Sequence, residues 1–147
     1  MSTRGLLSFR FNGQDYVTYN HSDSYPKALG AWICRFAQEH LDSQASIDAF
    51  GQRIQALEWV EGDRDREASR LQGRDLLEAL ANGKVRRVAR DNRAFTHSMD
   101  CEFAYILDLD AGLMEFRDLV DGGKVETFSL VSLTMCAVDV MECARRH

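Results

Sequence analysis

The chain opens with two short runs in which apolar and polar positions alternate. TRGLLSFRF at 3–11 and DYVTYN at 15–20 flank the dipeptide Asn12-Gly13. Alternation is typical of strands with one buried face, and Asn-Gly is a strong hairpin signal because both residues accept positive φ. The pattern therefore predicts a β-hairpin in which paired residue numbers sum to about 25.

Helical spacing follows the hairpin. Apolar residues at 26–41 repeat at three and four positions, which predicts a helix with Pro26 in its first turn. A second helix is expected at about 46–60, and a short third one at 74–83, where a glycine ends the pattern. The polar segment 61–73 between them is expected to be a loop or a solvated helical turn.

Alternation returns in the second half of the chain. The runs 102–109, 113–119 and 124–130 are separated by glycine-containing turns and predict a three-stranded meander. A C-terminal helix is expected at 132–146, with one apolar stripe made of Leu133, Cys136, Ala137, Val140 and Ala144. Strands, helices, strands and a helix in this order indicate the α+β class. We expect one domain over 1–147, with helices covering one face of an antiparallel sheet of about five strands.

Composition narrows this picture only slightly. The 147 residues are 45% hydrophobic and 28% charged, with a net charge of −5, which favours a globular domain and disfavours nucleic acid and anionic membranes as partners. The N-terminus lacks the apolar run of a signal peptide, and the stretch 128–144 is too short and polar to span a bilayer. Four cysteines without a CxxC pair predict reduced thiols and a cytoplasmic location. No nucleotide-loop or nucleophile-elbow signature is present, so we expect no cofactor.

Hydrogen-bonding side chains crowd the junction between the second predicted strand and the first predicted helix, at 20–25. In one interpretation they converge on a ligand near the helix N-terminus, and His21 acts as a general base oriented by Asp23. In the other, Asp23 or Ser24 caps the helix and Asn20 satisfies the loop backbone. The two interpretations are compatible, because a capped helix can still present a site.

Three stretches of the chain carry a resemblance. TRG at 3–5 and TYNHSDSYPKALG at 18–30 resemble the pattern of small, mostly uncharacterised proteins of bacteria and their phages that begin TRG and carry TYNHxDSYPxxLG. The segment FAYILDLDAGLMEF at 103–116 is similar to a later part of the same proteins. The resemblance implies no established activity. It implies that one binding unit is formed by Thr3, Arg4, Asn20, His21, Asp23, Ser24 and Tyr25.

Arg4 has a specific place in this unit. The hairpin register puts it opposite His21, where its guanidinium can hold Asp23 or an anionic ligand. The alternative to a binding protein is therefore a small hydrolase-like enzyme that uses His21 and Asp23, with Arg4 steadying an anion. A weaker similarity is to the N-terminal nucleophile hydrolases, in which loss of Met1 would make Ser2 the nucleophile.

The segment 84–93 is strongly basic within an acidic chain, and the periodicity assigns it no secondary structure. Its side chains could grip phosphates, with Arg86, Arg87 and Arg90 as candidates, or they could form a solvated face. HSMDCE at 97–102 offers four metal-binding residue types, but not in a recognised ligand spacing, so no metal is expected.

The resemblance favours a small soluble accessory protein of the phage or mobile-element type. Its concrete form would be an inhibitor of a bacterial defence system, either anti-CRISPR-like or binding a nucleotide signal. The expected partner is a protein or an anionic small molecule rather than nucleic acid or a membrane, and the apolar C-terminal helix is a candidate homodimer face. A basic cleft between 84–93 and 20–25 would favour a nucleotide, and a flat apolar patch would favour a protein.

Overall fold

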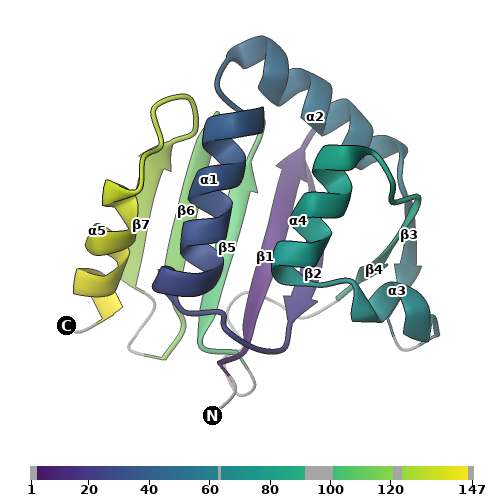
Figure 1. Cartoon of the computed structure of the whole chain (residues 1–147), viewed down its shortest axis with the longest axis horizontal. Coiled ribbons are helices and arrows are strands. Elements are labelled where there is room, and N and C mark those ends of the chain that lie inside the picture. The colour runs from purple at the N-terminus through teal and green to yellow at the C-terminus, as the bar shows by residue number, and fades with distance from the viewer. Residues whose placement is uncertain (1–2, 63, 92–100, 121–123, 146–147) are drawn as a thin grey trace.

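A computed structural model of the chain describes residues 3–62, 64–91, 101–120 and 124–145. It contains a five-stranded sheet in the order β2-β1-β5-β6-β7, with helices lying over one face (Figure 1). The strands of this sheet are β1 (Gly5–Phe11), β2 (Gln14–Asn20), β5 (Phe103–Asp108), β6 (Leu113–Asp118) and β7 (Lys124–Ser129). The predicted α+β domain, with an N-terminal hairpin and a C-terminal meander, is confirmed.

The hairpin has the predicted register. Gly5 pairs with Asn20, and the turn residues Asn12 and Gly13 take φ values of 51° and 74°. The carboxylate of Asp110 accepts hydrogen bonds from the backbone N–H groups of both turn residues, at 2.8 and 2.9 Å. This contact fixes the tip of the hairpin against the turn that follows β5.

The sheet is mixed rather than fully antiparallel. β1 pairs antiparallel with β2, and the β5-β6-β7 meander is antiparallel throughout, but β1 and β5 run parallel. A parallel pair needs a crossover connection, and here the chain between β2 and β5 includes the helices over one face of the sheet. The central pair therefore joins the two halves of the chain.

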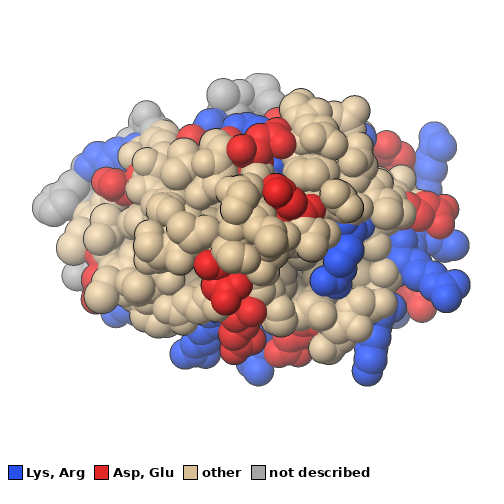
Figure 2. Space-filling view, turned by 90° about the horizontal axis from the view of Figure 1, so that it is seen from above, with Lys and Arg blue, Asp and Glu red and all other residues tan. Residues whose placement is uncertain are grey.

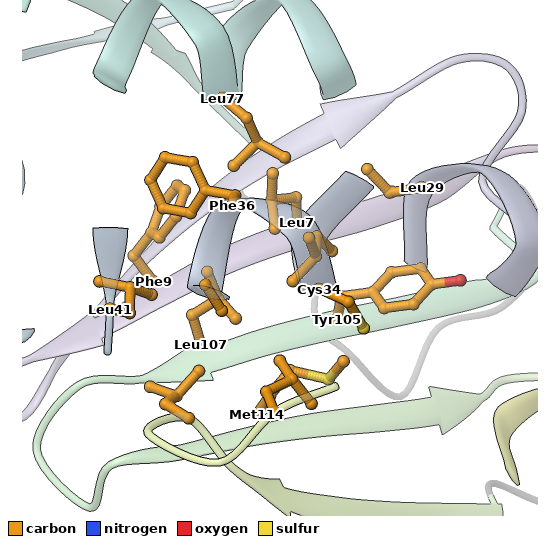
Figure 3. Packing of buried hydrophobic residues seen from close by; sticks show 14 of the residues in the cluster. Leu7, Phe9, Leu29, Cys34, Phe36, Leu41, Leu77, Tyr105, Leu107 and Met114 are labelled. Atoms are coloured by element: carbon orange, nitrogen blue, oxygen red, sulfur yellow. The ribbon is translucent and has the colours of Figure 1, made fainter. Parts of the chain in front are cut away.

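The helical layer supplies the other half of the core. Its elements are η1, a single π-helical turn (Pro26–Gly30), α1 (Ala31–His40), α2 (Gln44–Ala56), α3 (Arg66–Arg70), α4 (Gly73–Asn82) and α5 (Cys136–Arg145). Figure 3 shows side chains from β1, β5, α1 and α4 meeting between the layers, among them Phe9, Tyr105 and Phe36. Phe9 and Tyr105 are completely buried, and burial of one such side chain contributes about 1.5–3 kcal/mol.

The predicted helix 46–60 is wrong at its C-terminal end. α2 stops before Leu57, which has extended backbone with ψ of 154°. The Ile54 carbonyl accepts both the Leu57 N–H at 3.3 Å and the indole Nε1–H of Trp59 at 3.0 Å, so the residues after the helix fold back onto its last turn. The apolar spacing that suggests a longer helix thus belongs to a helix end and a strand.

That strand is β3 (Glu58–Glu61), which pairs parallel with β4 (Arg87–Arg90) from the unassigned basic segment. The pair lies beside the outer edge of β2, where the Asp91 N–H donates to the Val17 carbonyl at 2.8 Å. The remaining polar segment contains the short helix α3, as the expectation of a solvated helical turn allows.

The C-terminal helix is present, but α5 begins at Cys136 rather than at about 132, and its buried stripe differs from the predicted one. Ala137, Val138 and Met141 face the core, whereas Val140 is 43% exposed and Cys136 is exposed. The segment is apolar on more than one side, so periodicity could not decide which side is inside. None of the described helices is long and apolar enough to cross a membrane.

Candidate functional site

The 20–25 junction is first a hydrogen-bonded structural unit. Asn20 is buried, and its amide donates to the Ser22 carbonyl at 2.7 Å and to Ser24 Oγ at 2.8 Å. Ser24 is completely buried, its N–H donates to the Thr3 carbonyl, and its carbonyl accepts from the Tyr105 hydroxyl at 2.7 Å. Asn20, Ser24 and Thr3 therefore hold the loop onto the sheet.

The predicted side-chain cap is wrong. Tyr25 occupies the N-cap position of η1, and no side chain accepts a backbone hydrogen bond there. Asp23 instead takes a φ of 57°, and its backbone carbonyl accepts from the Leu29 N–H at 3.1 Å. Backbone hydrogen bonds thus close the wide first turn of the helix, and Tyr25 packs against the core.

His21 and Asp23 are both exposed, so both are available to a ligand. The Nδ1 atom of His21 lies 3.0 Å from the Tyr19 hydroxyl, and its backbone N–H donates to Gln72 Oε1 at 2.8 Å. The ring partner of His21 is therefore Tyr19, rather than the carboxylate of Asp23 that the sequence predicted as its orienting group.

Arg4 is exposed at the same end of the hairpin, one residue before the Gly5–Asn20 pair. Its backbone carbonyl accepts from the Glu102 N–H at 2.8 Å. The ion pairs between described residues do not include one from Arg4 to Asp23. The pairing of β1 with β2 therefore agrees with the predicted position of Arg4 opposite His21. The predicted role of Arg4 in holding an anion stays a prediction.

The basic segment is partly neutralised where it forms β4. Arg87 lies 2.9 Å from Asp65 Oδ2 and 3.5 Å from Glu58 Oε2. The hydrogen bond to Asp65 and the nearby carboxylates raise the pKa of Arg87. Figure 2 shows blue and red side chains intermixed at the end of the molecule that carries β3, β4 and α3. Arg86 and Arg90 are exposed, and the Arg90 guanidinium lies 3.5 Å from the Asp15 carbonyl.

A pocket of about 370 Å³ lies between the end of β2, the β3–β4 pair and the connection from α3 to α4. Tyr19 lines it from β2, Arg90 and Asp91 from β4 and its end, and Gln72 from the α3–α4 connection. The remaining lining residues are Thr18, Glu61, Gly62, Ser69, Leu71 and Ala89. Gln72 also accepts the His21 N–H, so it connects this pocket directly to the 20–25 junction.

Several pocket residues escaped the sequence analysis. Glu61 and Gln72 have no motif around them, and Tyr19, although it lies in the 18–30 stretch, was not among the candidates; only the fold brings the three beside Arg90. One signal was available at Gly73, which starts α4 with a φ of 54°. A Cβ atom there would lie 2.5 Å from Asn20 Oδ1, so glycine at this position permits the close contact between α4 and the junction.

The remaining predicted chemistry falls partly outside the described residues. Ser2, Arg93 and His97 belong to that part of the chain. Within the described ranges, no group of three or more His, Cys, Asp or Glu side chains is placed to hold a metal ion.

By fold, then, the chain is an α+β protein with a mixed five-stranded sheet and a polar pocket beside one edge. No protein-family model, curated protein or solved structure matches it. The resemblance carried by residues 3–5, 18–30 and 103–116 therefore stays a prediction.

Proposed function

We propose that this protein is a small accessory protein of the phage or mobile-element type, which acts in the cytoplasm by binding a nucleotide signal of a bacterial defence system. The observation that carries the proposal is the pocket between the 20–25 junction and β4. Arg90 of the basic segment and Tyr19, next to the junction in the chain, line it. The junction itself contacts it through the hydrogen bond from the His21 N–H to Gln72. Its volume lies in the range of small-ligand sites, about 300–1,000 Å³.

The lining favours a particular kind of nucleotide. Tyr19 offers an aromatic ring for a base, and Arg90 offers a guanidinium that suits a phosphate. Glu61 and Asp91 offer acceptors for ribose hydroxyl or base amino groups. With two carboxylates against one guanidinium, the lining does not favour a polyphosphate or a nucleic-acid backbone. We therefore expect a nucleoside or a ligand with a single phosphate group.

Arg90→Ala tests the ligand part of the proposal. A panel of nucleotides is titrated while the melting temperature is recorded: adenosine and AMP are the expected ligands, and ADP-ribose and cyclic dinucleotides, which carry two phosphates, serve as comparisons. A ligand at about 100 times its Kd stabilises the folded state by about 2.7 kcal/mol, which corresponds to roughly 5–10 °C for a domain of this size. The shift should disappear in Arg90→Ala and persist in Arg74→Ala, because Arg74 is an equally exposed arginine that pairs with Glu78 outside this pocket.

If no member of the panel shifts the melting temperature, or if Arg74→Ala loses the shift as Arg90→Ala does, the nucleotide proposal fails. The defence part needs a separate assay. The protein is expressed in a bacterial host that carries a signal-dependent defence system, and phage plating is compared between the parent and Arg90→Ala. Restored plating with the parent alone is the expected result.

The hydrolase alternative has one supporting contact, the 3.0 Å approach of Tyr19 to His21 Nδ1, which would fix the ring orientation of a base. It predicts that a bound nucleotide is converted to product and that His21→Ala stops the conversion. The binding proposal predicts that the nucleotide is recovered unchanged. Mass spectrometry of the ligand after incubation with the parent protein separates the two.

A further inference from the structure

The two edges of the main sheet are not alike. β2, at one edge, is covered by the β3–β4 pair through the contact from Asp91 to Val17. β7, at the other edge, pairs only with β6 within the described part of the chain. An open edge presents a row of backbone donors and acceptors to another strand. A partner strand is therefore structurally possible at β7.

Exposed apolar side chains are concentrated in the part of the chain that contains β7. The exposed large hydrophobic residues of the described chain all lie at or after residue 113, with exposed fractions of 37–60%: Leu113, Val120, Val125, Val131, Met135 and Val140. Val125 of β7 and Val140 of α5 line one shallow groove with Lys124, Glu126 and Cys143. Figure 1 shows α5 lying over β7 at this end of the sheet. The groove thus combines an open strand edge with an apolar helix face.

We propose that β7 pairs antiparallel with β7 of a second copy of this chain and forms a two-fold symmetric dimer. Side chains alternate between the two faces of a sheet along each strand, and residues that face each other across an antiparallel pair point to the same face. Both strands of this pair are copies of β7, so facing residues must both have even numbers or both have odd numbers. A two-fold axis at Val125 places Lys124 opposite the partner's Glu126, and Glu126 opposite the partner's Lys124. Two complementary charge pairs then flank a Val–Val contact.

The neighbouring registers lack this complementarity. An axis at Glu126 places two glutamates opposite each other, and an axis at Thr127 places Glu126 opposite Phe128. Opposite charges across a strand pair stabilise it, whereas like charges destabilise it. Charge therefore selects the register centred on Val125.

The position of the groove independently supports the same axis. Val140 and Cys143 of α5 line the same groove as Lys124, Val125 and Glu126. A two-fold axis at Val125 therefore brings Val140 and Cys143 of one copy close to the same residues of the second copy. The ladder in this register is short, and the contact between Val140 of both copies adds apolar area to it. A second copy fits this surface because it supplies both the matching charges and the matching apolar face.

Charge reversal tests the dimer and its register together. Sedimentation and light scattering of the parent at a chain concentration of about 100 μM should give a dimer mass. Lys124→Glu and Glu126→Lys should each raise the dimer Kd by roughly tenfold or more, because symmetry makes each change act twice. The double variant with both changes should return to the parental Kd, while Lys84→Glu, at an exposed position on the α4–β4 connection, should leave it unchanged.

Val140→Glu provides a second arm, since it places a charge in the helix contact at a position that is already 43% exposed and so leaves the fold intact. It should also dissociate the dimer, and circular dichroism should show unchanged secondary structure. A parent that is monomeric at this concentration would overturn the proposal and would identify Lys124 and Glu126 as edge protection. A dimer that tolerates the single reversals, or that the double variant does not restore, would overturn the register.

Discussion

Asn20 allows the structural part of the junction to be measured separately from any ligand. Its side chain is 5% exposed and donates to Ser22 and Ser24, and Asn20→Ala removes both hydrogen bonds. The Ser22 carbonyl is in an exposed residue, where water can replace the amide, so this loss costs about 0.5–1.5 kcal/mol. The Ser24 hydroxyl is completely buried, and loss of its donor costs about 1–3 kcal/mol. We expect the free energy of unfolding to fall by about 2–4 kcal/mol in total.

Urea unfolding followed by tryptophan fluorescence measures this change, and the melting temperature should fall by roughly 10 °C. His21→Ala is the matched control from the same loop, because its side chain is exposed, and its free energy of unfolding should stay within about 0.5 kcal/mol of the parent. An equally small effect of Asn20→Ala would refute the structural role of the amide.

Gly73 sharpens this experiment. An alanine there would place its Cβ 2.5 Å from Asn20 Oδ1, so Gly73→Ala should destabilise the protein through that contact and through the φ of 54°. In the Asn20→Ala background the contact is gone and only the backbone cost remains. The double variant should therefore be more stable than the sum of the single effects predicts, by about 1 kcal/mol. Simple additivity would show that α4 does not press on the junction.

Three further predictions concern positions away from the junction. Gly13→Val should lower the free energy of unfolding by about 1–3 kcal/mol, measured by urea unfolding, because a β-branched residue resists the φ of 74°. No neighbouring atom lies within 4 Å of the new Cβ, so this cost comes from the backbone and not from a clash. Burial raises the pKa of Cys34 to about 11, so native protein at pH 8 should react with a thiol reagent rapidly at Cys143 and only after unfolding at Cys34. The hydrogen bond from the backbone N–H of Ala68 is the main cause of the lowered pKa of Asp65. The stability that the Asp65 carboxylate contributes is therefore present at neutral pH and is lost as the pH falls below about 4. The stability difference between the parent and Asp65→Asn, from urea unfolding, should therefore shrink between pH 7 and pH 3.

The sequence predicted the parts of the fold that depend on near neighbours. Asn12-Gly13 sets the hairpin register because the turn alone determines which residues pair. The pairing of Glu58 with Arg87 joins residues far apart in the chain, so the apolar pattern around Trp59 was extended into the preceding helix. The parallel contact between β1 and β5 is long-range for the same reason. Local periodicity holds no information on either partner.

The candidate site shows the same division. Crowding at 20–25 was visible, but the sequence could not show that Asn20 and Ser24 face inward while His21 stays exposed. The basic segment was visible too, but not that Asp65 and Glu58 neutralise Arg87, which leaves Arg90 as the pocket cation. In both cases the three-dimensional arrangement removed some candidates and added uncharged residues such as Gln72.

The proposed ligand pocket and the proposed dimer contact lie at opposite edges of one sheet, and this separation makes a last prediction. Four strand spacings separate β2 from β7, a distance of about 19 Å. Effects of changes more than about 10 Å apart that share no partner usually add. Arg90→Ala should therefore leave the dimer Kd unchanged, and Lys124→Glu should leave nucleotide binding unchanged even where it produces monomers. Calorimetric titration of the Lys124→Glu monomer checks this. A loss of binding there would mean that the dimer completes the pocket, which the position of Arg90 at the far edge argues against.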